Sequence, residues 1–325
     1  MTTATAPKGR RRRDVAQPAC EREPRRLGDV ASPAASAPGR PLLEERNVLI
    51  QAGFTLTYDC AAPTPMLLAL DVHPSRRQDL TTPQTLEFDR PLAARRYLDA
   101  FGNSCTRILA PEGRTTISTS FEIYDDGEPD EVDLSAAQPS PSEVPDTALI
   151  YLLGSRYCDT DLLADFAWRT FGGVEPGWAR VQAVCDFAHE RIRFDYAAAD
   201  PTRTAHGAFV EGVGVCRDFA HLAVTLCRCL NIPARYCTGY LGDIGIPPQP
   251  YPMDFSAWFE VWLGGRWRTF DARHNTPRIG RILMAAGRDA TDVALSTSFG
   301  AARLVGFDVF TDEVPAGALR AASGG

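Results

Sequence analysis

The stretch Gly212-Val-Gly-Val-Cys-Arg-Asp-Phe-Ala-His221 places a cysteine directly after a glycine-rich turn. From Cys216 to about Leu230, apolar residues recur at i, i+3 and i+4 spacing, which predicts an amphipathic helix that begins at the cysteine. A thiol at this place feels the positive end of the helix dipole and nearby N–H groups, which favour a thiolate and can hold an oxyanion. The pattern therefore predicts a cysteine nucleophile suited to acyl transfer.

The segments around this helix predict an α+β domain. Helical periodicity marks two earlier helices, and strand-like runs follow the cysteine helix, the last two joined by a Gly-Gly turn. The helices are expected around 162–167 and 179–192, and the strands over 234–240, 257–263 and 266–271. We therefore expect the helix that carries Cys216 to lie against an antiparallel sheet.

The N-terminal half has a different periodicity. Period-two runs separated by turn residues predict an antiparallel sheet or sandwich, with strands over 48–58, 66–72, 106–109 and 115–124. An acidic stretch rich in Pro and Ser, residues 125–146, is typical of an interdomain linker. We expect three parts: a tail over 1–45, a β-rich N-terminal domain over 46–145 and a second domain over 146–325.

The tail is rich in Pro, Ala, Ser and Arg and shows no apolar periodicity, which predicts disorder. Its run Arg10–Arg13 can touch nucleic acid or lipid, although a solvated tail is the simpler interpretation. The first 40 residues hold nine Lys/Arg against four Asp/Glu in a chain of net charge −7, so the remainder is strongly acidic. This charge argues against nucleic acid as the main partner.

Cysteine usage and hydropathy bear on compartment and cofactors. The nine cysteines are an odd set without a CxxC pair, which indicates neither a disulfide scaffold nor a zinc ribbon. No run approaches the roughly 18 to 20 apolar residues of a membrane span, and no hydrophobic segment follows the N-terminal charges. Neither a P-loop nor GxGxxG occurs. We expect a cytoplasmic protein that uses no metal, no cofactor and no membrane.

Three segments together resemble the bacterial transglutaminase-like superfamily in their order and spacing. They are Gly214-Val-Cys-Arg-Asp-Phe-Ala-His-Leu-Ala223, Leu230-Asn-Ile-Pro-Ala-Arg-Tyr-Cys-Thr-Gly-Tyr240 and Ala257-Trp-Phe-Glu-Val-Trp-Leu-Gly-Gly-Arg-Trp-Arg-Thr-Phe-Asp271. Residues 47–125 look like the β-rich N-terminal domain of many bacterial members. The resemblance implies a papain-like core with a Cys at a helix start, a His on the first strand and an Asp on the next. Cys216 matches the nucleophile, and Asp271 matches the residue that orients the His.

The chain departs from the family pattern at the base. Where the family has His-Ala-Trp, this sequence reads Ser256-Ala257-Trp258. Imidazole, with a pKa of about 6.5, can take the thiol proton and pass it to a leaving amine, whereas a serine hydroxyl cannot do so near neutral pH. The loss is worth about 10²- to 10⁴-fold in rate unless another histidine substitutes.

Two histidines near the motif can substitute. His274 lies three residues after Asp271, where a bend can turn its ring toward Cys216. His221 lies on the helix at about 140° from the thiol, at 100° per residue, so packing or hydrogen bonding explains it better. His274 is therefore the preferred base.

Other residues near the motif have two interpretations each. Trp258 and Asp218 are candidates for substrate binding. Trp258 can instead form part of the core or of the cleft wall, and Asp218 can instead form a solvated ion pair with Arg217. Asp271 can instead pair with a nearby arginine. The basic, glycine-punctuated run 277–292 either lines the cleft and binds an acidic group or forms a solvated turn.

These observations lead to one main hypothesis and two others. The main one is an amidase, peptidase or crosslinking enzyme that acts on a carboxamide or peptide bond through a Cys216 thioester, with Asp271 orienting His274. The second is an inactive protein of the same fold that binds peptides or amides, because Ser256 occupies the usual base position. The third is a scaffold whose β-rich domain and tail recruit a partner. Neither the identity of the peptide or amide substrate nor the oligomeric state follows from the sequence.

Overall fold

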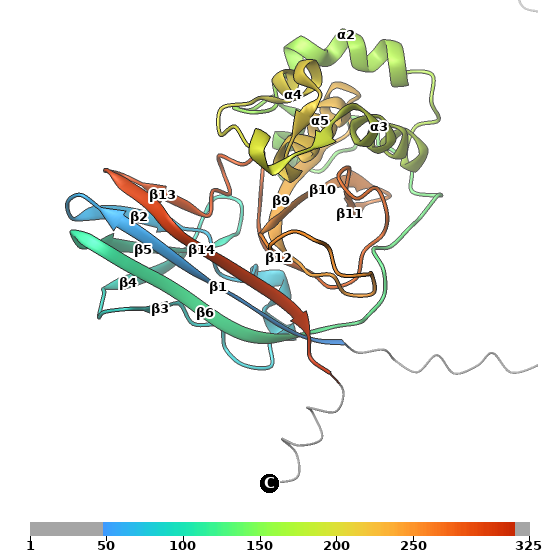
Figure 1. The fold of residues 1–325 in the computed structure, drawn as a ribbon. Helices are drawn as coiled ribbons and strands as arrows, with labels where there is room; N and C mark the ends of the chain where they lie inside the picture. The colour runs from blue at the N-terminus through green and yellow to red at the C-terminus, as the bar shows by residue number, and fades with distance from the viewer. Residues whose placement is uncertain (1–47, 316–325) are drawn as a thin grey trace, which may run out of the picture. The chain divides into compact units, whose positions relative to one another are not determined.

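A computed structural model describes residues 48–315 (Figure 1). The expected tail over 1–45, with its run Arg10–Arg13, lies outside the described residues. Three four-stranded antiparallel sheets and one short parallel pair form the β-structure of the described part. The parallel pair joins β7 (Arg193–Phe194) to β8 (Val213–Gly214), directly before the cysteine helix.

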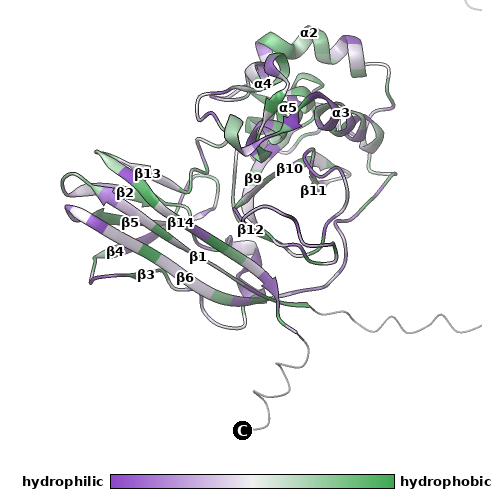
Figure 2. Cartoon of the chain, viewed as in Figure 1, coloured by the Kyte–Doolittle hydropathy of each residue, from purple (hydrophilic) through white to green (hydrophobic). Residues whose placement is uncertain are grey.

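Two of the sheets make up the β-rich part. One has the order β14-β1-β6-β3 and the other β13-β2-β5-β4. The strands are β1 (Val48–Cys60), β2 (Thr64–Leu68), β3 (Glu87–Phe88), β4 (Ala94–Leu98), β5 (Ser104–Ala110), β6 (Gly113–Asp125), β13 (Ser296–Ser298) and β14 (Ala302–Glu313). Figure 2 shows hydrophobic and hydrophilic residues mixed along these strands, as expected for strands with one buried face.

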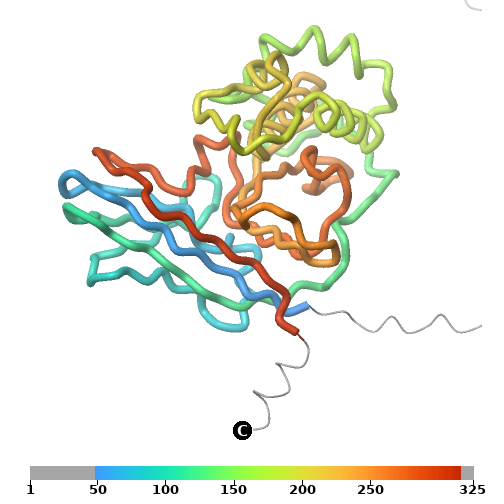
Figure 3. Tube along the Cα trace, viewed as in Figure 1, coloured from blue at the N-terminus to red at the C-terminus, as the bar shows by residue number. Residues whose placement is uncertain are grey.

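The last strands of the chain belong to these N-terminal sheets. Strand β14 pairs antiparallel with β1: Ile50 lies opposite Glu313 at one end, and Cys60 lies opposite Ala302 at the other. Strand β13 pairs antiparallel with β2. Figure 3 shows the first and last strands of the described chain side by side. The expected second domain over 146–325 therefore needs correction: its strands after residue 295 complete the β-rich part. A strand on each side satisfies the backbone groups of β1.

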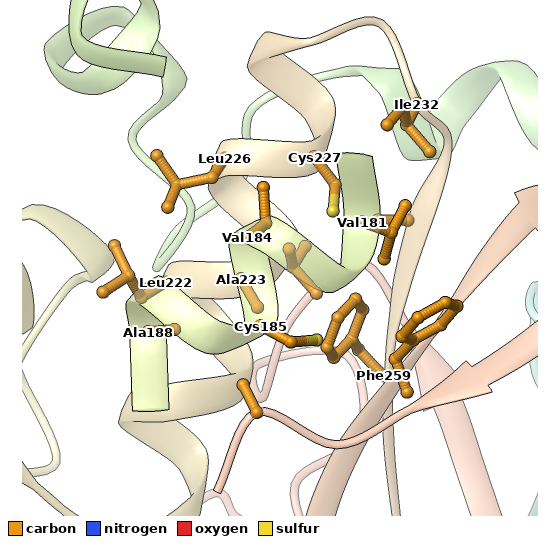
Figure 4. Close-up of a cluster of buried hydrophobic side chains, with 14 of the residues drawn as sticks. Val181, Val184, Cys185, Ala188, Leu222, Ala223, Leu226, Cys227, Ile232 and Phe259 are labelled. Carbon is orange, nitrogen blue, oxygen red and sulfur yellow. The ribbon is translucent and has the colours of Figure 1, made fainter. Parts of the chain in front are cut away.

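The remaining sheet has the order β11-β10-β9-β12 and is covered by helices. Its strands are β9 (Ala234–Leu241), β10 (Ser256–Leu263), β11 (Arg266–Phe270) and β12 (Arg281–Gly287), and the helices are α1 (Asp146–Leu149), α2 (Thr160–Phe171), α3 (Trp178–Arg191), α4 (Ala205–Glu211) and α5 (Cys216–Cys229). Helix α5 packs against α2, α3, α4 and β10. Figure 4 shows Leu222, Ala223 and Leu226 of α5 beside Val184 and Cys185 of α3. The cysteine helix is thus the buried centre of this part.

The β-rich part and the helix-covered sheet share a hydrophobic core. Tyr240 of β9 and Ile282 and Met284 of β12 belong to the same buried cluster as Ile50 and Phe121 of the β-rich part. The described residues 48–315 accordingly belong to one compact unit. Burial of this shared apolar surface stabilises the arrangement of the two parts.

The acidic segment expected to be a linker connects β6 to α1 along the surface of the helix-covered sheet. Glu131 and Asp133 form ion pairs with Arg268 of β11 at 2.7 and 2.6 Å. Asp130 contacts Arg281 of β12. These contacts attach the segment to the sheet. No helix within residues 48–315 is long and apolar enough to cross a membrane.

Candidate active site

Cys216 is the first residue of α5, and the residues around it shape the start of this helix. The Asp218 carboxylate accepts a hydrogen bond from the Val215 backbone N–H at 2.8 Å and forms an ion pair with Arg203 at 3.3 Å. A carboxylate in the first turn satisfies a free N–H and interacts favourably with the helix dipole. The Gly-Val-Cys-Arg-Asp motif is therefore a capped helix start that holds the thiol in a fixed place.

The two residues expected to bind substrate have other partners. Asp218 is buried and takes part in the helix cap and the Arg203 ion pair. Trp258 is only 2% exposed, and the Arg281 guanidinium lies over its ring at 5.2 Å from the centroid. Their burial leaves little surface for a substrate, so this structure favours the supporting interpretation of both.

The Cys216 thiol is half-buried beside the start of β10. Burial raises the pKa of Cys216 to about 11, and the Asp254 carboxylate also raises it. The Arg273 guanidinium and the backbone N–H groups of Ala257 and Arg217 lower this pKa, but they offset the rise only in part. The thiol is therefore protonated near neutral pH, contrary to the expectation that the helix start alone favours a thiolate. Nucleophilic attack requires a base that removes the proton.

Asp271 and His274 form a hydrogen-bonded carboxylate–histidine pair. Asp271 Oδ2 lies 2.8 Å from His274 Nδ1, and Oδ1 accepts the backbone N–H groups of Arg273 and His274 at 2.9 and 3.0 Å. Burial raises the pKa of the Asp271 carboxyl, but the Arg281 guanidinium at 3.0 Å and His274 lower it by more. The pKa of Asp271 is therefore well below its usual range. The ionised carboxylate orients the ring so that Nε2 is the nitrogen left for proton transfer.

His274 and Ser256 line one small cavity, together with Arg273, Asp254 and Tyr196. Ser256 is buried at the start of β10, where its neighbour Ala257 directs a backbone N–H to Cys216. Arg273 precedes His274 and also acts on the thiol. The turn after Asp271 thus places His274 on the same cavity as Ser256, the position where the family pattern has its histidine.

His221 has a different environment. It is fully buried in α5, its Nε2 accepts the Ala290 backbone N–H at 3.1 Å, and its ring stacks on Tyr157 with centroids 5.0 Å apart. Burial lowers the pKa of His221 to about 3, so the ring is neutral at physiological pH. These contacts agree with a packing and hydrogen-bonding role.

Four residues near the site were missed as individual candidates in the sequence: Asp130, Asp254, Arg273 and Arg281. Arg281 lies in the basic run 277–292, for which binding of an acidic group was one interpretation. That group is the protein's own Asp271. Asp130 had no signal of its own, because its acidic segment has the composition of an ordinary linker.

Two further findings concern the cysteines and acids of the described residues. Eight cysteines of residues 48–315 are free, and seven of them are buried while Cys216 is half-buried. Within the same residues, no group of three or more His, Cys, Asp or Glu side chains has an arrangement that can hold a metal ion.

Comparison with known proteins places this site in a family context. Residues 164–272 match the family model of the transglutaminase-like superfamily, a range that includes Cys216, Ser256 and Asp271. The chain is 28% identical over 214 residues to the uncharacterized protein ML0607 of Mycobacterium leprae, a match that covers 61% of this chain and 73% of that protein.

One solved structure shows the same fold. A candidate cysteine protease from Cytophaga hutchinsonii superposes with a TM-score of 0.71 at 27% identity, over 83% of this chain and 92% of that chain. The periplasmic domain of TgpA from Pseudomonas aeruginosa aligns at 17% identity over 66% of this chain and 91% of that chain, with a TM-score of 0.32. The expected α+β fold, with a helix-borne cysteine against an antiparallel sheet and a β-rich part before it, is confirmed.

Proposed function

We propose that this chain, which belongs to the transglutaminase-like superfamily through residues 164–272, is a thiol enzyme that cleaves or transfers an amide or peptide carbonyl through a Cys216 thioester. The observation that supports this most directly is the Asp271–His274 hydrogen bond of 2.8 Å in the cavity beside Ser256. In this proposal, His274 supplies the imidazole that the sequence lacks at position 256. The likeness to a candidate cysteine protease supports the same chemistry.

The proposed reaction begins with transfer of the Cys216 Sγ proton to His274 Nε2. The thiolate attacks the carbonyl carbon, the carbonyl π electrons move to oxygen, and the backbone N–H groups at the start of α5 stabilise the oxyanion. When the tetrahedral intermediate collapses, the C–N bond breaks and the imidazolium donates its proton to the leaving amine. Water or an amine then attacks the thioester, and the thiol is released.

Asp271 acts on the ring and not on the substrate in this scheme. Its carboxylate holds Nδ1–H and stabilises the imidazolium that forms when Nε2 takes the proton. Peptides or carboxamides are the proposed substrates. The free cysteines of residues 48–315 support the cytoplasm as the proposed compartment.

A second candidate function is binding of a peptide or amide without turnover. Two observations favour it: a serine occupies the position where the family pattern has a histidine, and burial raises the pKa of Cys216 to about 11. In that case His274 stabilises the turn after Asp271 and does not deprotonate the thiol.

One experiment separates catalysis from binding without turnover. It measures the rate of Cys216 alkylation by iodoacetamide as a function of pH in the full chain. For an enzyme, alkylation at pH 7 is faster than a buried thiol with a pKa of about 11 allows without a base, and it falls at least about 10-fold in His274→Ala, because no imidazole then accepts the thiol proton. His206→Ala, on α4, is the matched control and keeps the parental rate.

The binding function gives the opposite pattern. The thiol then titrates with a single high pKa, and His274→Ala leaves its alkylation rate unchanged. Only Ser256→His, which restores the family's base, increases the rate at pH 7. Cys216→Ala identifies the alkylation of other cysteines in every series.

A further inference from the structure

On the basis of the proposed function, we infer that the Asp130–Arg281 ion pair is a positioning device, through which the acidic segment before α1 keeps the Asp271–His274 pair ready to accept the thiol proton. Arg281 is the first residue of β12 and is buried. Its Nη2 lies 3.0 Å from Asp271 Oδ2, the same oxygen that contacts His274 Nδ1 at 2.8 Å. Arg281 acts through Asp271 and is not itself proposed to touch substrate.

Asp130 holds the other side of the guanidinium. Arg281 Nε lies 2.9 and 2.8 Å from the two oxygens of the Asp130 carboxylate. The Asp130 backbone N–H donates to the Arg278 carbonyl at 2.9 Å, and the Arg278 N–H donates back to Asp130 Oδ2 at 2.9 Å. Since Trp258 also stacks on the guanidinium, Arg281 has a fixed position between two carboxylates.

The charges of this chain of groups explain why Asp130 matters for catalysis. Transfer of the thiol proton leaves a negative charge on Cys216 Sγ and a positive charge on His274, so the total charge is unchanged. The positive charge on His274 adds to that of Arg281, and Asp271 and Asp130 together balance the two. Without the Asp130 charge, Asp271 alone faces both cations, and one positive charge beside the buried Arg281–Asp271 pair has no adjacent carboxylate. Burial makes such a charge more costly than it is in water. Asp130 therefore favours the imidazolium that the reaction requires.

The pair also lies where the two parts of the chain meet. Asp130, Trp258 and Arg281 line a cavity of about 880 Å³, to which the β-rich part contributes Arg76 and Asp125. Arg76 Nη1 donates to the Arg281 carbonyl at 2.6 Å. The β-rich part and its acidic connection thus support the strand from which Arg281 reaches the site.

Other titratable or charged groups surround the same residues and remain in place in every variant below. On the cavity side and along the sheets they are Arg76, Asp79, Asp125, Asp126, Glu128, Glu131, Cys185, Arg235, Cys237, Asp243, Asp254, Glu260, Arg273 and Arg278. A comparison of variants within the acidic segment therefore isolates the charge at position 130.

The test is the pH dependence of Cys216 alkylation by iodoacetamide in the full chain, with Asp130→Asn against Asp133→Asn. Asp133 lies in the same segment and loses the same charge, but it pairs with Arg268 and not with Arg281. We expect Asp130→Asn to slow alkylation at pH 7 by about 10-fold, the effect of about one pKa unit, and Asp133→Asn to match the parent. Only above the Cys216 pKa of about 11 do all three rates converge, because hydroxide then forms the thiolate.

A double variant separates positioning from general loosening of the fold. In the His274→Ala background, Asp130→Asn should have no further effect at pH 7, since both changes act through the imidazolium. Asp130→Glu, which keeps the charge, should recover most of the parental rate. Equal rates for Asp130→Asn and Asp133→Asn, or additive losses in the double variant, would overturn the inference while leaving the proposed function intact. A rate insensitive to His274→Ala would overturn both.

Discussion

Gly214 and Asp218 fit together only because position 214 has no side chain: a Cβ at Gly214 would lie 2.4 Å from Asp218 Oδ2. That oxygen caps the Val215 N–H, one residue before Cys216. The glycine of the Gly-Val-Cys motif is thus required by the close approach of the capping carboxylate.

Replacement of Gly214 by alanine should displace this cap and the thiol together. We expect a loss of about 1–3 kcal/mol in the free energy of unfolding, as for other insertions into a well-packed site, and a slower alkylation of Cys216. The measurement is urea unfolding followed by the iodoacetamide rate. Gly173→Ala is the control, because a Cβ there meets nothing within 4 Å. Equal stability of the two variants would show that the cap adapts without cost.

Asp271→Asn should affect both stability and chemistry. The substitution leaves the buried Arg281 with a weaker partner, and breaking a buried ion pair costs about 3–5 kcal/mol. The pKa of Asp271 is lowered in the folded state, so its stabilising effect is present above the usual Asp pKa of about 3.9 and is lost as pH falls through the folded value.

Urea unfolding of the parent and Asp271→Asn between pH 7 and pH 2 checks this. The stability difference should be largest above about pH 5 and should shrink in acid. Asp165→Asn, at an exposed position of α2, is the control and should follow the parent at every pH. A difference between parent and Asp271→Asn that is independent of pH would contradict the assigned charge of Asp271.

The sequence predicted those parts of the fold that depend on local periodicity. The helix expected from Cys216 to about Leu230 is α5 (Cys216–Cys229), and the strand expected over 266–271 is β11 (Arg266–Phe270). The pairing of β14 with β1 was not predicted, because it joins segments more than 240 residues apart through backbone hydrogen bonds that leave no pattern in either segment.

The same limit applies to the site. The Gly-Val-Cys motif and the spacing from Asp271 to His274 are local and were recognised in the sequence. The contact between Asp130 and Arg281 joins residues 151 positions apart, and burial of the thiol depends on loops from several elements. Both effects therefore become visible only in the folded chain.

Alkylation of the native protein should be selective among the described cysteines. Of the eight in residues 48–315, seven are buried and Cys216 is half-buried, so Cys216 is the one that we expect a small reagent to modify first. Mass spectrometry of the folded Cys20→Ser variant after brief iodoacetamide treatment should find one modified site, at Cys216. Comparable modification of Cys105 or Cys229 in the folded state would contradict the burial described for them.

His221 should make the protein sensitive to mild acid. Burial lowers its pKa to about 3, whereas the unfolded chain binds a proton at about 6.5. Above pH 6.5 the ring is mostly neutral in the unfolded chain too, so His221 costs the folded state little there. As pH drops below 6.5, the unfolded chain binds a proton that the folded chain does not, and the free energy of unfolding falls until the pH reaches the folded pKa. Between pH 7 and pH 5 this single group should cost the parent about 2 kcal/mol relative to His221→Phe, which cannot titrate.

The measurement is the urea unfolding of both proteins at pH 7 and pH 5. At pH 7 His221→Phe should be the less stable by about 1–3 kcal/mol, since the Ala290 N–H loses its buried acceptor, and at pH 5 the gap should narrow or reverse. His206→Gln controls for removal of a histidine and should keep the parental change with pH. If His221→Phe and the parent lost equal stability between pH 7 and pH 5, His221 would not be the buried neutral group that the structure shows.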